Sequence, residues 1–214
     1  LFSQASGPEE IHVAASQYLI LYFLIDAVRR FHAAHPDVRV RLSSHTEQEI
    51  EELLLRDADV AFGIAAPYEP PLELEYRDLF PLAWSLITPL RRRLGRSRSV
   101  ALQDVSQAPL IVFEPGSTGR QHVMEAFRSA GLQPRIEMET TNTEIIVRMV
   151  EAGLGVSIVP LLPNGMVTKG RRVKVRSFAR QVRPIQSGVL TRKGGTLSPA
   201  SREFMRFLLP GSQG

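Results

Sequence analysis

The chain has 214 residues, of which 43% are hydrophobic and 22% are charged, and it contains 15 glycines, 15 prolines and no cysteine. This composition is typical of a soluble globular protein and excludes collagen-like, disordered and disulfide-stapled chains, together with thiolate catalysis and thiolate metal sites. The formal net charge of +4 points to an anionic partner.

Neither a membrane anchor nor an export signal is predicted. No apolar run approaches the ~20 residues of a membrane span. The segment Leu1–Gln4 lacks the basic and apolar regions of a secretion signal. We therefore expect a cytoplasmic protein that does not contact a membrane.

The N-terminal part alternates between strand and helix patterns. The expected elements are a strand Ile11–Ala15, a helix from about Tyr18 to His35, a strand Val38–Leu42, a helix Thr46–Arg56 and a strand Val60–Ile64. Such alternation predicts a parallel sheet with helices on its faces.

After Ile64 the pattern changes and then repeats. Leu74–Leu79 and Leu82–Thr88 read as two strands with no helix between them. A second strand–helix series follows, with strands Leu110–Phe113, Ile136–Met138 and Val156–Val159 separated by helices that end near Gly131 and Gly153. Two further strands, Val173–Phe178 and Val182–Leu190, precede a last helix Pro199–Leu209.

These patterns predict an α/β fold made of two Rossmann-like lobes. The first lobe would comprise residues 1–87 and 188–214, because the tail has no strand–helix series of its own and should return to the first half. The second lobe would comprise residues 88–187. Two segments, near Leu86–Pro89 and Gln186–Leu190, would cross between the lobes.

Small polar residues follow four of the expected strands, where open parallel sheets bind ligands. They are Ser16 and Gln17, Ser43 and Ser44, Ser117 with Thr118 and Gly119, and Thr141 with Asn142. Each set opens a helix, whose free N–H groups and dipole favour an anion or a carboxylate. Helix capping explains any one of these loops equally well. Four such loops facing each other across a hinge favour a binding cleft.

The sequence offers no assembled catalytic or metal site. Ser117 directly follows a glycine, so the loop is not a G-x-S-x-G nucleophile elbow, and the phosphate-binding and dinucleotide-binding glycine motifs are missing. His45 is the one histidine expected near the loops, and it is more simply a polar contact than a base. We therefore expect neither enzymatic activity nor a cofactor.

One basic cluster has no assigned role. Arg91, Arg92 and Arg93, with Arg96 and Arg98, lie beside Pro89 and Gly95 and read as a loop. A solvated loop and a nucleic-acid or subunit contact both explain it. No aromatic residue interleaves with the arginines, so the pattern for stacking on single strands is absent.

The order of these residues resembles a known family, the effector-binding domain of LysR-type transcriptional regulators. The resemblance rests on the strand ending in Ser16, on Phe31-x4-Pro36-x-Val38, and on the strand Asp59–Ile64. Phe127-x3-Gly131-Leu132-x-Pro134 and Val150-x2-Gly153-x-Gly155-Val156-x-Ile158-Val159-Pro160 strengthen it. The match covers about Glu10 to Leu209 and implies a type 2 periplasmic-binding-protein-like fold.

Within that family, the stretch from Ser117-Thr118-Gly119-Arg120 through Ile136, with Thr141-x-Thr143-Glu144, looks most similar to the cysteine-biosynthesis regulator subgroup. The resemblance implies that Ser16 and Thr118 match positions that bind a small anion. Tyr18 and Leu19 stand where that subgroup tends to carry Thr and Gln.

Family resemblance further implies a winged helix-turn-helix of roughly 90 residues before residue 1, through which the full-length protein would bind DNA. It also implies a homodimer, and a tetramer at full length, in which the helix Tyr18–His35 and the strand Val38–Leu42 pack against a partner. The expected function is a ligand-sensing regulatory domain that binds a small, anionic effector between its lobes. The alternatives are a free two-lobed solute-binding protein of a transport system and a phosphate- or carboxylate-handling transferase.

Overall fold

The computed structural model describes residues 8–95 and 99–209, which form two compact units. Unit 1 contains residues up to Ala65, residues Glu69–Leu79 and residues from Ser187 onward, and unit 2 contains Ala66–Tyr68 and Phe80–Gln186. The chain passes between the units within two strands, β4 (Leu74–Pro89) and β9 (Ile185–Arg192), and also at both ends of the short segment Ala66–Tyr68. The lobe boundary expected from the sequence, at residue 87, also lies within β4. The division of the chain into two lobes at that residue stays a prediction.

Unit 1 contains the expected parallel sheet. The strands β1 (Glu10–Ala15), β2 (Arg39–Ser44) and β3 (Val60–Ala65) pair in the order β2-β1-β3, and both pairings are parallel. Strand β9 adds to β3 in antiparallel register. The intervening helices are α1 (Gln17–Leu19), the π-helical turn η1 (Ile20–Leu24), α2 (Ile25–Ala34) and α3 (Glu47–Arg56).

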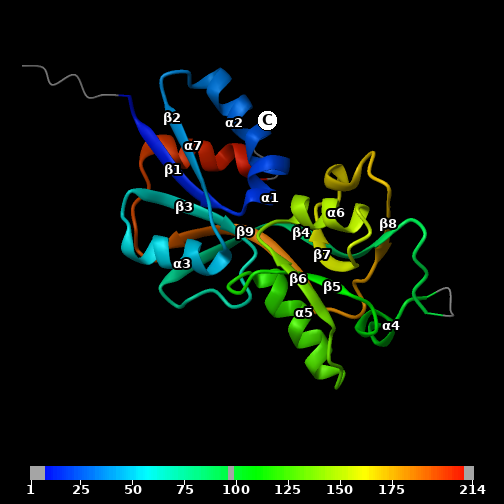
Figure 1. Ribbon diagram of the computed structural model, residues 1–214. Coiled ribbons are helices and arrows are strands. Elements are labelled where there is room, and N and C mark those ends of the chain that lie inside the picture. Colours follow the sequence, from blue (N-terminus) through cyan, green and yellow to red (C-terminus); the bar gives the residue numbers. More distant parts are fainter. Residues whose placement is uncertain (1–7, 96–98, 210–214) are drawn as a thin grey trace, which may run out of the picture. The chain divides into compact units, whose positions relative to one another are not determined.

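Both faces of this sheet are covered by helices, as Figure 1 shows. Strand residues alternate between faces, and β3 shows the result in two successive residues. A Cβ on Gly63 would lie 2.5 Å from Ile50, so that face packs tightly against α3. Phe62 faces the other way, towards Phe204 of the C-terminal helix α7 (Pro199–Leu208), with ring centres 6.1 Å apart.

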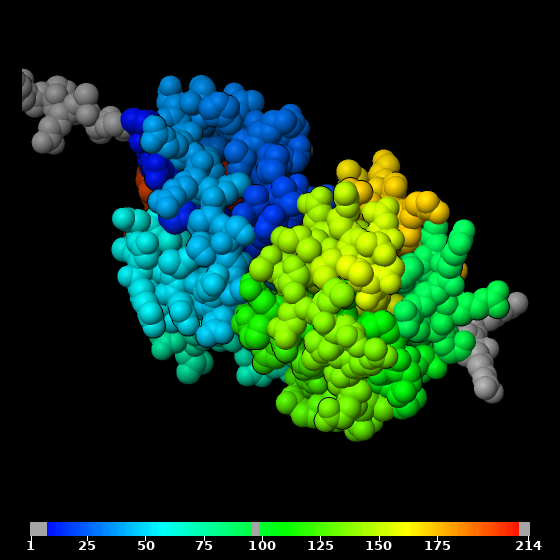
Figure 2. All heavy atoms as spheres, viewed as in Figure 1, coloured from blue at the N-terminus to red at the C-terminus, as the bar shows by residue number. Residues whose placement is uncertain are grey.

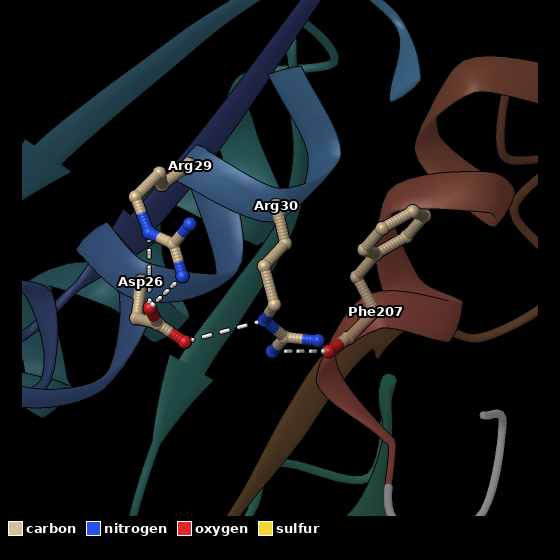
Figure 3. Close-up of polar contacts among 4 residues, drawn as sticks. All are labelled: Asp26, Arg29, Arg30 and Phe207. Carbon is tan, nitrogen blue, oxygen red and sulfur yellow. Dashed lines mark hydrogen bonds and ion pairs between the residues drawn. The ribbon is translucent and has the colours of Figure 1, made fainter. Parts of the chain in front are cut away.

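The C-terminal tail packs on unit 1. Phe204 is fully buried and lies 5.0 Å from the Phe31 ring of α2. Arg30 links the same two helices, because its guanidinium donates to the carbonyl of Phe207 at 3.2 Å while also contacting Asp26 (Figure 3). A buried aromatic cluster thus attaches residues from the end of the chain to strands near its beginning.

Unit 2 contains the second strand–helix series. Its elements are α4 (Leu102–Ser106), β5 (Leu110–Phe113), α5 (Thr118–Ser129), β6 (Ile136–Thr140), α6 (Thr143–Glu151), β7 (Ser157–Leu161), the 3-10 turn η2 (Met166–Thr168) and β8 (Val173–Ser177). Strands β5 and β6 are parallel, whereas β4 pairs antiparallel with both β7 and β8. Trp84, Val112, Val123 and Phe127 belong to its hydrophobic core.

Three details differ from the sequence-based expectation. The two strands expected at 74–79 and 82–88 form the single strand β4, because Pro81, which has no N–H to donate, lies just before the ladder to β7 that begins at Ala83. The strand expected from Val182 begins at Ile185, after Pro184. The short helix α4 was not anticipated.

We predict that Phe204→Ala lowers the free energy of unfolding by about 3–5 kcal/mol, because it leaves a cavity between α2, α7 and the sheet. Phe207→Ala is the matched control, since Phe207 is only partly buried, and it should cost clearly less. Urea denaturation followed by circular dichroism measures both values. Equal costs for the two variants would contradict this account of the core.

Candidate functional site

In unit 1 the polar residues after β1 and β2 lie side by side. Ala15 and Ser44 are paired in the parallel ladder, and the His45 N–H donates to the Ala15 carbonyl at 3.0 Å. Ser16, the next residue after Ala15, therefore lies beside Ser44 at the carboxyl edge of the sheet. Gln17 and Ser44 are exposed, and Ser16 is partly exposed.

Two hydroxyl groups at this edge already have partners. The Ser16 side chain caps its helix by accepting a hydrogen bond from the Leu19 N–H at 3.4 Å. Ser43 Oγ lies 2.7 Å from His12 Nε2, and burial, with the nearby Arg41, lowers the pKa of that histidine. Because His12 is then neutral at pH 7, Ser43 contacts a neutral ring inside unit 1.

Unit 2 gathers its polar residues in the same way. Phe113 and Thr140 are paired at the ends of β5 and β6, and the Glu114 N–H donates to the Thr140 carbonyl at 3.0 Å. Ser117 caps α5 through the Arg120 N–H at 3.2 Å, and Asn142 caps α6 through the Ile145 N–H at 2.9 Å. The starts of two helices thus share one edge of this sheet.

An arginine fixes the start of α5 to both strands. Arg120 Nη1 donates to the Phe113 carbonyl at 2.9 Å and to a Glu139 carboxylate oxygen at 2.7 Å. Sequence reasoning noted Arg120 but missed Glu139, because the contact depends on the β5–β6 register, which pairs Glu139 with Val112. The Glu139 carboxylate offsets the charge of Arg120, and the N–H groups of the first helical turn add positive potential at the same edge.

Burial separates the predicted residues of unit 2. Thr118 and Asn142 are 3% and 6% exposed, whereas Thr141 is exposed. A Cβ on Gly119 would lie 2.9 Å from the Phe113 ring, so packing alone requires glycine there. The predicted residues therefore form two sets, Ser16, Gln17, Ser43 and Ser44 in unit 1, and Ser117, Thr118, Gly119, Thr141 and Asn142 in unit 2.

Both sets can donate and accept hydrogen bonds, but they carry no pair of groups arranged for proton transfer. His45 Nδ1 lies 3.6 Å from a carboxylate oxygen of Glu49 on α3, so the contact of this histidine is with an acid and not with a serine or threonine that could act as a nucleophile. Across residues 8–95 and 99–209, three metal-ligating side chains never gather at one point. Within the same residues, each helix is too short or too polar to cross a bilayer.

One buried histidine anchors α5 to the core of unit 2. His122 is 3% exposed, its ring lies 4.7 Å from Tyr68 and 5.5 Å from Trp84, and its Nδ1 has no hydrogen-bond partner among the described residues. Burial, assisted by the positive charge of Arg183, lowers its pKa from 6.5 to about 4. His122 lies one turn beyond Thr118 on α5.

We predict that unit 2 loses stability as the pH falls from about 6.5 to about 4. In this window the unfolded state binds a proton at His122 and the folded state does not, so the free energy of unfolding falls, by on the order of 2 kcal/mol. His122→Phe keeps an aromatic ring but cannot titrate, and it should flatten this dependence. Fluorescence of Trp84, the single tryptophan of the chain, reports unfolding of unit 2.

Exposed His32 on α2, changed to Gln, is the control for this measurement. It should retain the pH dependence of the unchanged chain. If His122→Phe shows the same slope as the His32→Gln variant between these pH values, the assignment of a neutral, buried His122 is wrong.

A family model and several curated proteins match this chain. The family model described as the LysR substrate binding domain matches residues 4–213. The HTH-type transcriptional regulator cbl of Klebsiella aerogenes is 33% identical over 73% of this chain and 49% of its own length. CysB of Burkholderia cenocepacia is 29% identical over 72% of this chain and 50% of its own. The chain thus spans about half the length of these curated relatives.

Solved structures show the same fold. The cofactor-binding domain of the Cbl transcriptional regulator matches with a TM-score of 0.84 at 23% identity, covering 99% of this chain and 91% of that domain. The effector-binding domain of QuiR, in complex with shikimate, matches with a TM-score of 0.81 at 21% identity, covering 95% and 96%.

These matches confirm the α/β fold and the resemblance to the Cbl and CysB regulators, and they do not favour the transport-protein alternative. With a family model covering almost all of its length, this chain belongs to the LysR substrate-binding-domain family.

Proposed function

We propose that this domain senses a small anion without transforming it, and that both polar sets contribute to one effector site. The observation that carries the proposal is that the same arrangement of parallel strands, polar loops and helix starts occurs in both units. In each unit, parallel strands bring hydroxyl groups and the starts of helices to one edge of a sheet. Such edges bind anions and carboxylates through N–H groups and short polar side chains.

Within this proposal, Ser16, Ser44, Thr118 and Asn142 mark the loops that bond to the effector, and the other five predicted residues flank them. Tyr18 and Leu19 are buried, at 8% and 3% exposure, where the similar subgroup tends to carry polar residues. Unit 1 would therefore offer fewer side-chain donors, and an anion with an apolar portion suits it better than a fully hydrated one.

The same proposal includes a way in which effector binding could be transmitted to the rest of a regulator. An effector that prefers one arrangement of the two units shifts the equilibrium towards it, whereas one that bound all arrangements equally would change nothing. The crossing strands β4 and β9 connect the units covalently. We propose that this shift alters oligomer geometry and thereby the DNA binding of a full-length regulator in the bacterial cytoplasm. The names of the relatives as transcriptional regulators support this role.

Oligomerisation is supported by an apolar helix surface. Leu21 is 38% exposed and Ile25 is 51% exposed on the continuous helix from η1 to α2. Neighbouring apolar residues exposed on one helix are typical of a surface that a partner covers. We propose that this helix and strand β2 form the homodimer contact expected from the family resemblance, and that the full-length protein assembles further into a tetramer.

The binding proposal is tested with Ser16→Ala combined with Thr118→Ala. Native mass spectrometry first identifies any small molecule that the purified chain carries, and a thermal-shift panel of sulfate, phosphate and small carboxylates provides probes otherwise. We expect the double variant to bind the best probe about 10- to 100-fold more weakly by calorimetry, because two hydrogen bonds to an anion are lost.

Ser198→Ala is the matched control for this experiment, because Ser198 caps α7 through the Ser201 N–H and lies at neither polar edge. It should cost about 1 kcal/mol of stability while leaving affinity unchanged. Unchanged affinity in the double variant would reject these loops as the binding site. Product formation from a bound probe would reject the non-enzymatic assignment.

The dimer proposal is tested with Ile25→Glu. A buried, unpaired carboxylate in the contact should shift the chain towards monomer by at least about tenfold in dissociation constant. Leu72→Glu is the control, because Leu72 is 86% exposed and lies outside the helix. Sedimentation equilibrium measures both variants, and equal dimer stability would contradict the proposed contact.

A further inference from the structure

The two units differ strongly in charge. Unit 2 contains 16 basic and 7 acidic side chains, a net charge of +9, whereas unit 1 contains 10 basic and 15 acidic ones, a net charge of −5. Along the sequence, apart from the Arg91–Arg98 cluster, the basic residues look evenly spread, so this asymmetry becomes visible only after the chain is divided by its contacts. Such asymmetry is typical of proteins that contact a polyanion.

Strand β8 and its flanks concentrate this charge. Residues 152–183 include seven basic side chains and no acidic one. Arg172, Lys174, Arg176 and Arg180, here called the basic face, are all exposed, and Figure 2 shows the yellow-to-orange atoms of this segment at the surface of unit 2. The nearest acid in sequence, Glu151, lies within 4 Å of Arg148 and Arg171 and also accepts the backbone N–H of Arg172.

The face continues from β8 onto the segment after β4. Val173 pairs with Pro89 in the antiparallel ladder, so Arg91 to Arg93 leave β4 next to Arg172. Arg96 and Arg98 of the same cluster lie outside the described residues. A hollow of about 550 Å³ near the end of β8 is lined by Arg176, Ser177, Arg180 and Ser99. Arginines beside hydroxyl groups are a typical environment for a phosphate.

We propose that the basic face binds the phosphate backbone of duplex DNA independently of its sequence. Lys174 and Arg176 are two residues apart on β8, so they lie on one side of the strand about 6.6 Å apart, and Arg172 immediately precedes the strand. A row of three cations at this spacing would span about 13 Å, the axial length over which one DNA strand presents roughly four phosphates. A single small anion would use only part of such a row.

Other occupants fit this face less well. Residues 169–180 contain one aromatic residue, Phe178, and it is buried, so the face lacks the aromatic anchors of protein interfaces and the stacking rings of single-strand binders. Cations do protect exposed strand edges from aggregation. That role does not explain Arg180 and Arg91–Arg93, which lie outside the strand.

The contact needs only modest affinity. The relatives named as HTH-type regulators are about one and a half times as long as this chain, because matches of 163 and 156 residues cover 49% and 50% of them. If the proposed function holds, the DNA-binding part of the full-length protein would keep the duplex at a high effective concentration. The family resemblance implied that DNA contacts only an N-terminal domain. In the present proposal that domain recognises the DNA sequence, and the basic face of this chain contacts the phosphate backbone.

The test uses this 214-residue chain with a fluorescent duplex of arbitrary sequence and measures anisotropy over a range of salt concentrations. We expect binding at low salt that weakens steeply as salt rises. Lys174→Glu with Arg176→Glu should reduce affinity at least about tenfold and lower the slope of log affinity against log salt by about two. Lys174→Arg with Arg176→Lys should bind like the unchanged chain.

Arg202→Glu with Arg206→Glu is the matched control, because these exposed arginines lie one turn apart on α7, outside both the basic face and the proposed dimer contact, and the net charge changes equally. This control should lose less than about twofold in affinity. The proposal would be overturned if both glutamate pairs lost DNA affinity equally or if the unchanged chain did not bind DNA. It would also be overturned if polyglutamate competed for the chain as strongly as unlabelled DNA.

Two further measurements separate this proposal from misfolding and from the effector hypothesis. The milder pair Lys174→Gln with Arg176→Gln should weaken DNA binding while circular dichroism and the Trp84 fluorescence remain unchanged. Calorimetric affinity for the anionic probe should also be retained in the β8 variants. The DNA assignment would be overturned if the β8 variants lost affinity for the anionic probe together with affinity for DNA. It would also be overturned if these variants changed the oligomeric state and left DNA affinity unchanged.

Discussion

Parallel strand pairing is the constraint on which the rest of the structure depends. When β1 and β2, or β5 and β6, run in the same direction, their carboxyl ends must lie at one edge, and the helices that follow must begin there. N–H groups that have no acceptor within their own helix, and short capping side chains, are therefore concentrated at two edges. The proposed chemistry of this protein, hydrogen bonding to a small anion, is a consequence of strand direction.

Capping and ligand binding make different demands on the same side chains. Ser117 and Asn142 each accept a hydrogen bond from a backbone N–H of their own helix, so both have a structural role before any ligand is considered. A hydroxyl oxygen has two lone pairs and one proton, and a capping serine can therefore still donate to an anion. The two roles are compatible, and stability must be measured beside affinity to distinguish them.

The two proposed interactions rely on electrostatics at different ranges. At the helix starts, fixed N–H dipoles act over a few ångströms, and the pairing of Arg120 with Glu139 removes a full charge from the site. On the basic face, whole charges lack acidic partners within the described residues and act over a Debye length of about 8 Å at physiological salt. The first arrangement favours selectivity for one small molecule, and the second favours attachment to a polyanion.

Hydrophobic periodicity, glycine and proline positions, and N-cap residues determined most of the element order, the α/β class, the parallel pairing of the first three strands and the family resemblance, because these signals are local. Tertiary structure decided what depends on register and packing. It joined two expected strands through Pro81, placed Glu139 on Arg120, committed Ser43 to His12 and buried His122 without a partner for its Nδ1. It also revealed the charge asymmetry, since charges distant in sequence become one surface only when strands such as β4 and β8 pair.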